Sequence, residues 1–216
     1  MGNRVSFEGY SIVSCGILRR ELNYLKKIGF LNADKISYTE PGLHANRGEL
    51  KSQLTRQLEK AKKHSQNIIV AYGEKCHPDI DEITRGNRIS RLEAEDCIDM
   101  LADLEKRKTM SGGKIGSVFW LSPGWLDYAN ENRYVWERIY KDHLEWSDAD
   151  ANVNFGTYRK AIFLDPKPLN VFDEYSPKRI LDFSGWTRLV VVRQEVTLNR
   201  LRNLMSRCVL KGRGKN

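Results

Sequence analysis

The segment Tyr10–Glu21, YSIVSCGILRRE, constrains the fold of this chain more than any other. Its first half is a short apolar run typical of a buried strand, and Gly16 interrupts that run. Leucines at helical spacing follow from Leu18 to Leu25, so a helix is expected there. Cys15 therefore lies where a strand ends and a helix begins. In an open α/β sheet, ligands bind at that end of the strands.

Strand-like and helix-like segments continue to alternate along the chain. Asn67–Tyr72, NIIVAY, is the continuous apolar run required of a strand in a sheet covered on both faces. Further strands are expected at residues 35–40, 88–92, 116–121, 161–165 and 188–192, and further helices at 48–64, from Cys97 onward, at 130–146 and at 198–208. This alternation predicts an α/β fold: a doubly wound, mostly parallel sheet with helices on both faces, followed by a C-terminal basic helix.

The charge of the chain is concentrated at its C-terminal end. The formal net charge is +8, and residues 197–216 contain six basic residues and no acidic one. Leucines at helical spacing make the start of this segment amphipathic. The sequence therefore favours a single α/β domain over residues 1–196 and a basic helix and tail over residues 197–216.

Composition and cysteine spacing restrict the class of protein. With 40% hydrophobic and 30% charged residues and no apolar run of membrane-spanning length, the chain is expected to be cytoplasmic and not membrane-bound. Its four cysteines are widely spaced, a pattern that favours free thiols or metal ligands over a disulfide framework.

Three potential metal ligands each follow one of the first three expected strands. Cys15 follows the first strand, His44 the second and Cys76 the third, while Cys97 opens a later expected helix. In a parallel sheet these positions meet at one edge, where three thiolates and an imidazole would suit a zinc ion or, as an alternative, an iron–sulfur cluster. Free cysteines are also common as small buried hydrophobic residues, and that interpretation stays open.

Cys97 has a further property that suits a ligand or a nucleophile. With Asp96 as the N-cap, Cys97 would lie in the first turn of a helix, whose dipole lowers the pKa of a thiol. His44 could then act as an acid–base partner in catalysis. Gly16 and Trp125 are the residues expected to contact a cofactor, Trp125 as part of the wall of the site.

Five motifs in order suggest a family. The motifs are CGILRREL, PGLHANRGEL, a strand ending in AYG with a cysteine soon after, EDCIDML and a strand ending in LSPGW. Together they resemble the uncharacterised prokaryotic domain-of-unknown-function family sixteen thirty-eight, best over residues 11–125. The resemblance implies an α/β protein with functional weight on Cys15, His44, Cys76 and the Asp96–Cys97 pair. By association with organisms that use corrinoid methyl transfer, it also suggests a role in one-carbon metabolism.

Three functions follow as expectations. The first is a metal-binding protein, possessing zinc or an iron–sulfur cluster, that performs thiolate- or metal-assisted group transfer on a small molecule. The second is a non-catalytic accessory protein whose basic C-terminal helix docks an acidic protein partner or, weakly and without sequence specificity, nucleic acid. The third is a metal-free enzyme with Cys97 as nucleophile and His44 as base.

Overall fold

The computed structural model describes residues 5–132, 157–169 and 171–213, and the chain divides into two compact units. Unit 1 comprises residues 1–101 together with 198–216, and unit 2 comprises residues 102–197. Each unit contains its own parallel sheet, so the predicted α/β class is confirmed. Whether residues 1–196 behave as one folding unit, as the sequence favours, stays a prediction.

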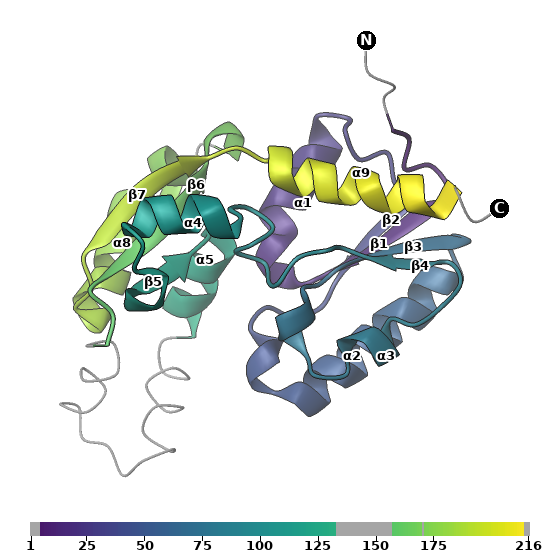
Figure 1. Cartoon of the computed structure of the whole chain (residues 1–216), viewed down its shortest axis with the longest axis horizontal. Helices are drawn as coiled ribbons and strands as arrows, with labels where there is room; N and C mark the ends of the chain where they lie inside the picture. Colours follow the sequence, from purple (N-terminus) through teal and green to yellow (C-terminus); the bar gives the residue numbers. More distant parts are fainter. Residues whose placement is uncertain (1–4, 133–156, 170, 214–216) are drawn as a thin grey trace. The chain divides into compact units, whose positions relative to one another are not determined.

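Unit 1 is built on a four-stranded sheet in the order β2-β1-β3-β4, with every pair of neighbours parallel (Figure 1). Its strands are β1 (Tyr10–Ser14), β2 (Lys35–Tyr38), β3 (Asn67–Ala71) and β4 (Ile89–Arg91). Its helices are η1 (Gly16–Leu18), α1 (Arg19–Lys27), η2 (Leu43–Ala45), α2 (Arg47–Lys62), η3 (Glu74–Cys76), α3 (Ile80–Ile83) and α9 (Asn199–Arg213).

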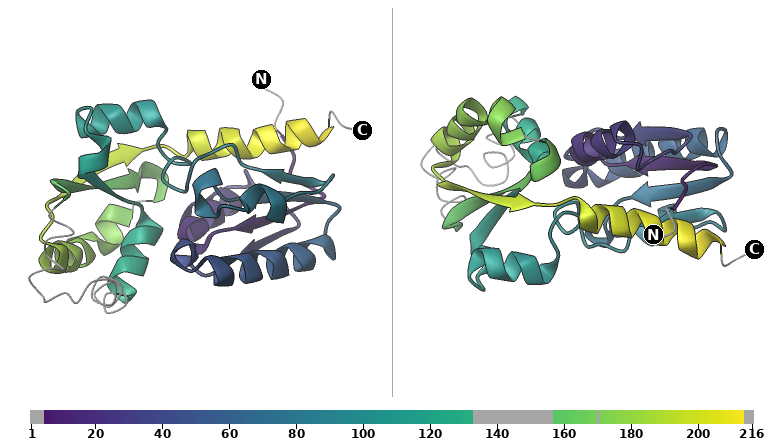
Figure 2. Two further views of the ribbon diagram at one scale, coloured as in Figure 1. Left: turned by 60° about the horizontal axis from the view of Figure 1, so that its bottom comes forward. Right: turned by 90° about the horizontal axis from the view of Figure 1, so that it is seen from above.

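Helices cover both faces of this sheet, with α2 and α3 on one side and α1 and α9 on the other (Figures 1 and 2). Val13, Ile68 and Val70 pack with the leucines of α2 in one hydrophobic cluster. Because successive side chains of a strand alternate between faces, Ile12 and Ile69 point to the other side, and both are fully buried. The apolar runs in β1 and β3 are therefore explained by burial on both faces.

The last helix, α9, is an integral part of unit 1. Its apolar side is buried, and the thiol of Cys208 donates a hydrogen bond of 3.6 Å to the backbone carbonyl of Arg91. This contact lies beside β4, the edge strand of the sheet. The position beside β4 is thus taken by a helix, and β5 begins a second sheet where the sequence predicted a single one.

Unit 2 is a three-stranded parallel sheet in the order β5-β6-β7. The strands are β5 (Val118–Leu121), β6 (Lys160–Pro166) and β7 (Val191–Val196), and the helices are α4 (Leu104–Ser111), η4 (Ile115–Ser117), α5 (Pro123–Glu131), η5 (Lys167–Leu169) and α8 (Val171–Thr187). Phe163 of β6 and Phe183 of α8 lie in the cluster where α5 and α8 pack on the sheet. Figure 2 shows α4 on the opposite side.

Several predicted boundaries in unit 2 differ from the observed ones. The strand predicted at 188–192 is observed as β7, which begins at Val191. The helix predicted at 130–146 lies outside the described residues from position 133 onward, and its first two residues belong to α5. Ser122 accepts a hydrogen bond from the Trp125 N–H and caps α5 with Pro123 in the first turn, so the SPGW segment starts a helix directly after β5.

The helix predicted to begin at Cys97 is wrong: residues 97–101 form turns, and the next helix is α4, capped by Asp103. The predicted cap is present, since the Asp99 N–H donates to Asp96 Oδ1 at 2.7 Å. The side chain of Asp99, however, accepts the Glu95 N–H and two bonds from Arg200. Leu104, the first residue of α4, is 43% exposed.

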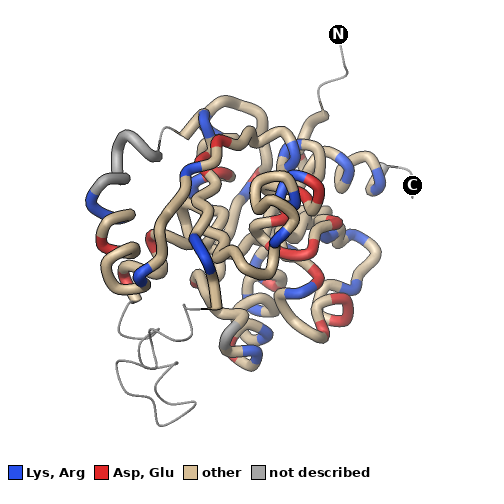
Figure 3. The backbone as a smooth tube through the Cα atoms, turned by 60° about the vertical axis from the view of Figure 1, so that its left-hand side comes forward, with Lys and Arg blue, Asp and Glu red and all other residues tan. Residues whose placement is uncertain are grey.

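Basic and acidic residues are interspersed over both units, and several basic residues lie along α9 (Figure 3). Among the described residues, no helix combines the length and the apolar character needed to cross a membrane.

Candidate functional site

Four loops meet at the carboxyl edge of the unit 1 sheet, because all four strands of this sheet run in the same direction. Cys15 follows β1, His44 lies in η2 after β2, Cys76 ends η3 after β3, and Asp96 lies in the loop after β4. Electrostatic interactions link Cys15 to Cys76, Cys76 to Asp96, and Asp96 to His44. We call these four residues the carboxyl-edge cluster.

Cys15 lies in extended backbone, with φ −60° and ψ 139°, immediately before η1. Burial raises the pKa of its thiol above the ordinary value. Hydrogen bonds from the backbone N–H groups of Ile17 and Gly42 and from the Tyr72 hydroxyl act in the opposite direction, because they stabilise the thiolate. Hydrogen-bond donors from three segments therefore surround the sulfur. Of the causes that shift this pKa, burial is the one that favours the protonated thiol.

Tyr72 connects the loops after β1, β2 and β3. Its hydroxyl is hydrogen-bonded to Thr39 Oγ1 and to the thiol of Cys15. Both Tyr72 and Thr39 are buried, with 2% and 1% of their surface exposed. Burial, with the neighbouring cysteines, raises the pKa of the Tyr72 hydroxyl, so this side chain is a neutral hydrogen-bond donor at the cluster.

Cys76 is half-buried, and His44, although exposed, is close enough to neighbouring protein atoms to have a shifted pKa. Burial is the main cause that raises the pKa of the Cys76 thiol to about 12, and the charges of Cys15 and Asp96 act in the same direction. Burial lowers the pKa of His44, and the carboxylate of Asp96 opposes that shift. In the absence of a ligand, the cluster thus presents two neutral thiols and an imidazole that favours its neutral form, with one carboxylate between them.

Two glycines allow the loops to approach so closely. A Cβ atom on Gly73 would lie 2.2 Å from the carbonyl oxygen of Glu95 and 2.4 Å from the backbone nitrogen of Asp96. On Gly16, a Cβ atom would lie 2.7 Å from the carbonyl oxygen of Thr39. Gly73 and Gly16 are therefore required by backbone contacts at the cluster. For Gly16, this is a packing role, and its predicted contact with a cofactor stays a prediction.

Arg200 of α9 holds the turn that contains Asp96 and Cys97. Its Nη2 atom is 2.9 Å from each carboxylate oxygen of Asp99, and its Nε–H donates to the backbone carbonyl of the same residue. Asp99 in turn accepts the N–H of Glu95 at 3.1 Å. A basic residue of the C-terminal helix is thus part of the scaffold that fixes the loop after β4.

Cys97 lies next to Asp96 in the chain and is half-buried. Because residues 97–101 form turns, the helix dipole that was expected to lower the pKa of its thiol is missing. The two predicted roles of Cys97, as a ligand and as a nucleophile, stay predictions without that support.

The remaining predicted residue, Trp125, lies in unit 2. It belongs to α5, where its ring meets that of Tyr128 edge-on at a centroid distance of 5.8 Å. It packs at the hydrophobic cluster of unit 2, and its predicted contact with a cofactor also stays a prediction. Cys208, which the sequence analysis left outside the predicted metal ligands, is buried on α9 against β4.

Sequence reasoning missed Tyr72 and Thr39; it gave Asp96 a capping role, and the family resemblance placed functional weight on Asp96 together with Cys97. Tyr72 ends the NIIVAY run, where it was counted as one more apolar residue, although a buried tyrosine hydroxyl needs a partner. Within the described ranges, no group of three or more Cys, His, Asp or Glu side chains is arranged to hold a metal ion. The side chains of the cluster are near one another, but they are not arranged around a common point.

Comparison with known proteins identifies the family of the chain. No curated protein and no solved structure matches it. A profile of the family described as "Protein of unknown function (DUF1638)" matches residues 38–205, a segment that contains His44, Cys76 and Cys97 and begins after Cys15. Because this segment covers most of the sequence and includes parts of both units, the chain belongs to the DUF1638 family.

Proposed function

We propose that the carboxyl-edge cluster binds a thiophilic metal ion, in the first instance zinc, with Cys15 and Cys76 as thiolate ligands and His44 and Cys97 as the further ligands. The observation that carries this proposal is the meeting of four loops at one sheet edge, which brings two cysteines, a histidine and a carboxylate together. Such a position, at the carboxyl ends of parallel strands, is where α/β proteins bind ligands.

The donor types fit zinc, which binds thiolates and neutral imidazoles at about 2.0–2.3 Å. The present side-chain arrangement of the described residues does not enclose a metal. Binding therefore requires side-chain rotation and loss of the thiol protons, both of which are common when a metal enters a site. His44 is exposed and lies in a short 3₁₀ helix, so its side chain can rotate without disturbing the core.

With the three thiolates as ligands and His44 as an acid–base partner in place of a fourth ligand, a zinc ion would keep one open coordination position and would supply a Lewis acid or an activated thiolate. We propose metal- or thiolate-assisted group transfer, in one-carbon metabolism, as the reaction class. Tyr72 would hold Cys15 in place through its hydroxyl, and Asp96 would orient His44 or accept a proton from it. An iron–sulfur cluster on the same thiolates is the alternative, since cysteines are also its usual ligands.

The two other expected functions have less support. A metal-free enzyme of this kind needs a cysteine that readily loses its proton. The pKa of Cys76 is about 12, and Cys97 lacks the predicted helix whose dipole would favour its thiolate. For an accessory protein that docks through its basic helix, Arg200 and Lys211 already bind Asp99 and Glu93 within unit 1. The Arg200–Asp99 pair contributes to the stability of unit 1 and removes Arg200 from the charge that α9 could offer to a partner, whereas the exposed Lys211–Glu93 pair contributes little.

The test is a titration of the metal-free protein with Co²⁺ and Zn²⁺. Thiolate ligation of Co²⁺ produces an intense near-ultraviolet charge-transfer absorption, and Zn²⁺ should displace it. We expect this band in the wild type and in Cys208→Ser, and its loss in Cys15→Ser and in Cys76→Ser. Absence of the band in the wild type, or an unchanged band in both cluster variants, would contradict the proposal.

A further inference from the structure

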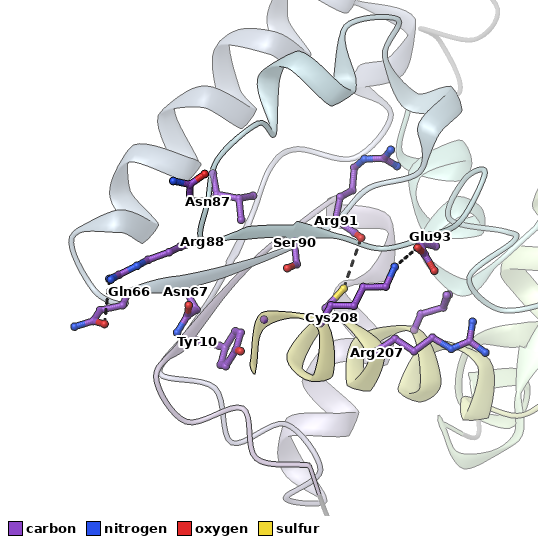
Figure 4. A pocket seen from close by; sticks show the side chains of 14 residues that line it. Tyr10, Gln66, Asn67, Asn87, Arg88, Ser90, Arg91, Glu93, Arg207 and Cys208 are labelled. Carbon is purple, nitrogen blue, oxygen red and sulfur yellow. Dashed lines mark hydrogen bonds and ion pairs between the residues drawn. The ribbon is translucent and has the colours of Figure 1, made fainter. Parts of the chain in front are cut away.

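A second concave site lies on unit 1, between the edge strand β4 and helix α9 (Figure 4). It has a volume of about 590 Å³, within the range of small-molecule sites. Its lining includes Tyr10 and Asn67, the first residues of β1 and β3. Because the strands are parallel, this end of the groove is at the opposite edge of the sheet from Cys15. We call it the β4–α9 groove.

Cations outnumber carboxylates in the lining of the groove. Arg88, Arg207 and Lys211 are exposed basic residues, and Glu93 is the one acidic residue that lines it in the described part of the chain. Figure 4 shows Arg88 and Gln66 at one end and Arg207 and Glu93 at the other. A ligand that spans the groove would therefore meet positive charge at both ends.

The partners of these cations leave them available to an anion. Arg88 Nη1 donates to the neutral side-chain oxygen of Gln66 at 3.1 Å. Lys211 pairs with Glu93, but both side chains are well exposed, at 58% and 60%, and such a pair contributes little to stability. A phosphate group could replace Glu93 as the partner of Lys211 at small cost.

Arg91 is different, because its guanidinium is bound to Asp81 at 2.6 Å and points away from α9 (Figure 4). It contributes its backbone to the groove, as the carbonyl that accepts the Cys208 thiol. Neutral donors complete the lining: the amides of Asn67 and Asn87 and the hydroxyl of Ser90. A groove with positive charge at both ends and amide and hydroxyl groups between them suits a phosphorylated molecule that also has polar, uncharged parts.

A smaller hollow continues the positive surface beyond Arg88. It shares Gln66 and Arg88 with the groove and adds Lys62, Lys63 and His64 from the end of α2. Positive charge at the C-terminal end of α2 is also favoured by the helix dipole, so this side can hold several basic residues without destabilising the fold.

We infer that the β4–α9 groove binds a small molecule that carries a phosphate or diphosphate group, of about the size of a mononucleotide. The inference does not depend on the metal proposed above, since the groove and the carboxyl-edge cluster use different residues.

The test uses inorganic pyrophosphate and ADP as probes, with binding followed by calorimetry at low and moderate salt. We expect both probes to bind the wild type, and Arg207→Gln and Lys211→Gln each to weaken binding at least about tenfold, as loss of one charge-assisted contact implies. Lys60→Gln, which removes an exposed charge of α2 outside the groove, should leave binding unchanged. Thermal melts of all variants should coincide, because these side chains are exposed.

Glu93→Gln gives an opposite and more specific expectation. It removes the carboxylate that competes for Lys211, so pyrophosphate should bind more tightly than to the wild type. Cys15→Ser should bind the probes normally, which separates this inference from the metal proposal. The inference is overturned if the wild type binds neither probe, if Lys60→Gln weakens binding as much as Arg207→Gln, or if only a single-stranded oligonucleotide binds, the last result indicating a nucleic-acid surface.

Discussion

At the scale of single residues, Tyr72 is the side chain on which the geometry of the carboxyl-edge cluster most depends. Its hydroxyl binds Thr39 and Cys15, which belong to two different loops. Tyr72→Phe would leave the buried Thr39 hydroxyl with one partner fewer, so we expect a loss of about 1–2 kcal/mol in the free energy of unfolding. Urea denaturation measures this change.

Tyr38→Phe is the matched control for that variant. The Tyr38 side chain is half-buried, but its hydroxyl donates to Asn23 Oδ1 at 2.8 Å at the protein surface, so removal of the hydroxyl should cost less than about 0.5 kcal/mol. Equal losses in the two variants would show that the Tyr72 hydroxyl has no special role at the cluster.

The sequence correctly predicted the position of residues that directly follow a strand. Cys15, His44 and Cys76 follow parallel strands, and the structure brings their loops to one edge. It failed where a contact depends on a distant residue: Asp99 is bound by Arg200, 101 positions further along the chain. No local pattern indicates such a pair, which holds a segment where residues 97–101 form turns in place of the expected helix.

At the scale of the elements, the loops after β3 and β4 are in backbone contact at Gly73. In Gly73→Ala, the new Cβ would lie within 2.4 Å of three backbone atoms of Glu95 and Asp96, which cannot move independently of their loop. We expect a loss of at least about 2 kcal/mol in unfolding free energy, as for other overpacked positions. Chemical denaturation followed by circular dichroism tests this.

Gly48→Ala provides the opposite expectation in the same unit. Gly48 lies in α2, and its nearest neighbour to a new Cβ is 3.8 Å away, so alanine should stabilise the helix by up to about 1 kcal/mol. If Gly73→Ala were as stable as Gly48→Ala, this result would contradict the close backbone contact between the loops after β3 and β4.

The ion pair between Arg200 of α9 and Asp99, in the segment after β4, predicts a difference in stability between two arginine variants. Arg200→Gln would leave the Asp99 carboxylate, which is 5% exposed, without its bidentate partner. Because Arg200 is itself partly exposed, we expect a cost of about 2–3 kcal/mol, somewhat below the cost of breaking a fully buried ion pair. Arg202→Gln, on the same helix, loses only a cation–π contact with Phe30 at 4.5 Å and should cost about 0.5–1 kcal/mol. Similar costs for both variants would contradict the proposed scaffold role of Arg200.

At the scale of the whole molecule, the α/β class was predictable because strand and helix periodicities alternate along the chain. The division into two sheets was not, because it depends on which element lies beside β4. The sequence predicted an amphipathic basic helix and tail over residues 197–216, and α9 buries Leu201, Leu204 and Met205 in unit 1. Deleting this segment to test partner binding would therefore also remove part of the core.

Several buried acids predict a loss of stability at high pH. Burial raises the pKa of Cys208 to about 11 and that of Tyr38 to about 12. In the unfolded chain, these groups lose their protons near about 8.5 and 10. The folded state holds the protons to higher pH, so stability that is fully present below about pH 8.5 is lost as pH rises toward the folded values.

Cys208→Ser tests the contribution of one such group, because serine does not titrate in this range. The decrease in unfolding free energy between about pH 9 and 11 should be shallower in this variant, by up to about 1.4 kcal/mol per pH unit. Parallel pH profiles for the variant and the wild type would show that Cys208 is not buried as the structure describes.

Metal content is the measurement that tests the central proposal most directly. Zinc, iron and acid-labile sulfide should be determined in protein purified without oxygen, for the wild type and for Cys15→Ser, Cys76→Ser, Cys97→Ser and Cys208→Ser, each with a thermal melt. We expect about one zinc per chain in the wild type and in Cys208→Ser, and its loss in the other three variants while all five proteins stay folded. Full occupancy in Cys15→Ser and Cys76→Ser, or a wild type without metal, would contradict a metal site at the carboxyl edge of unit 1.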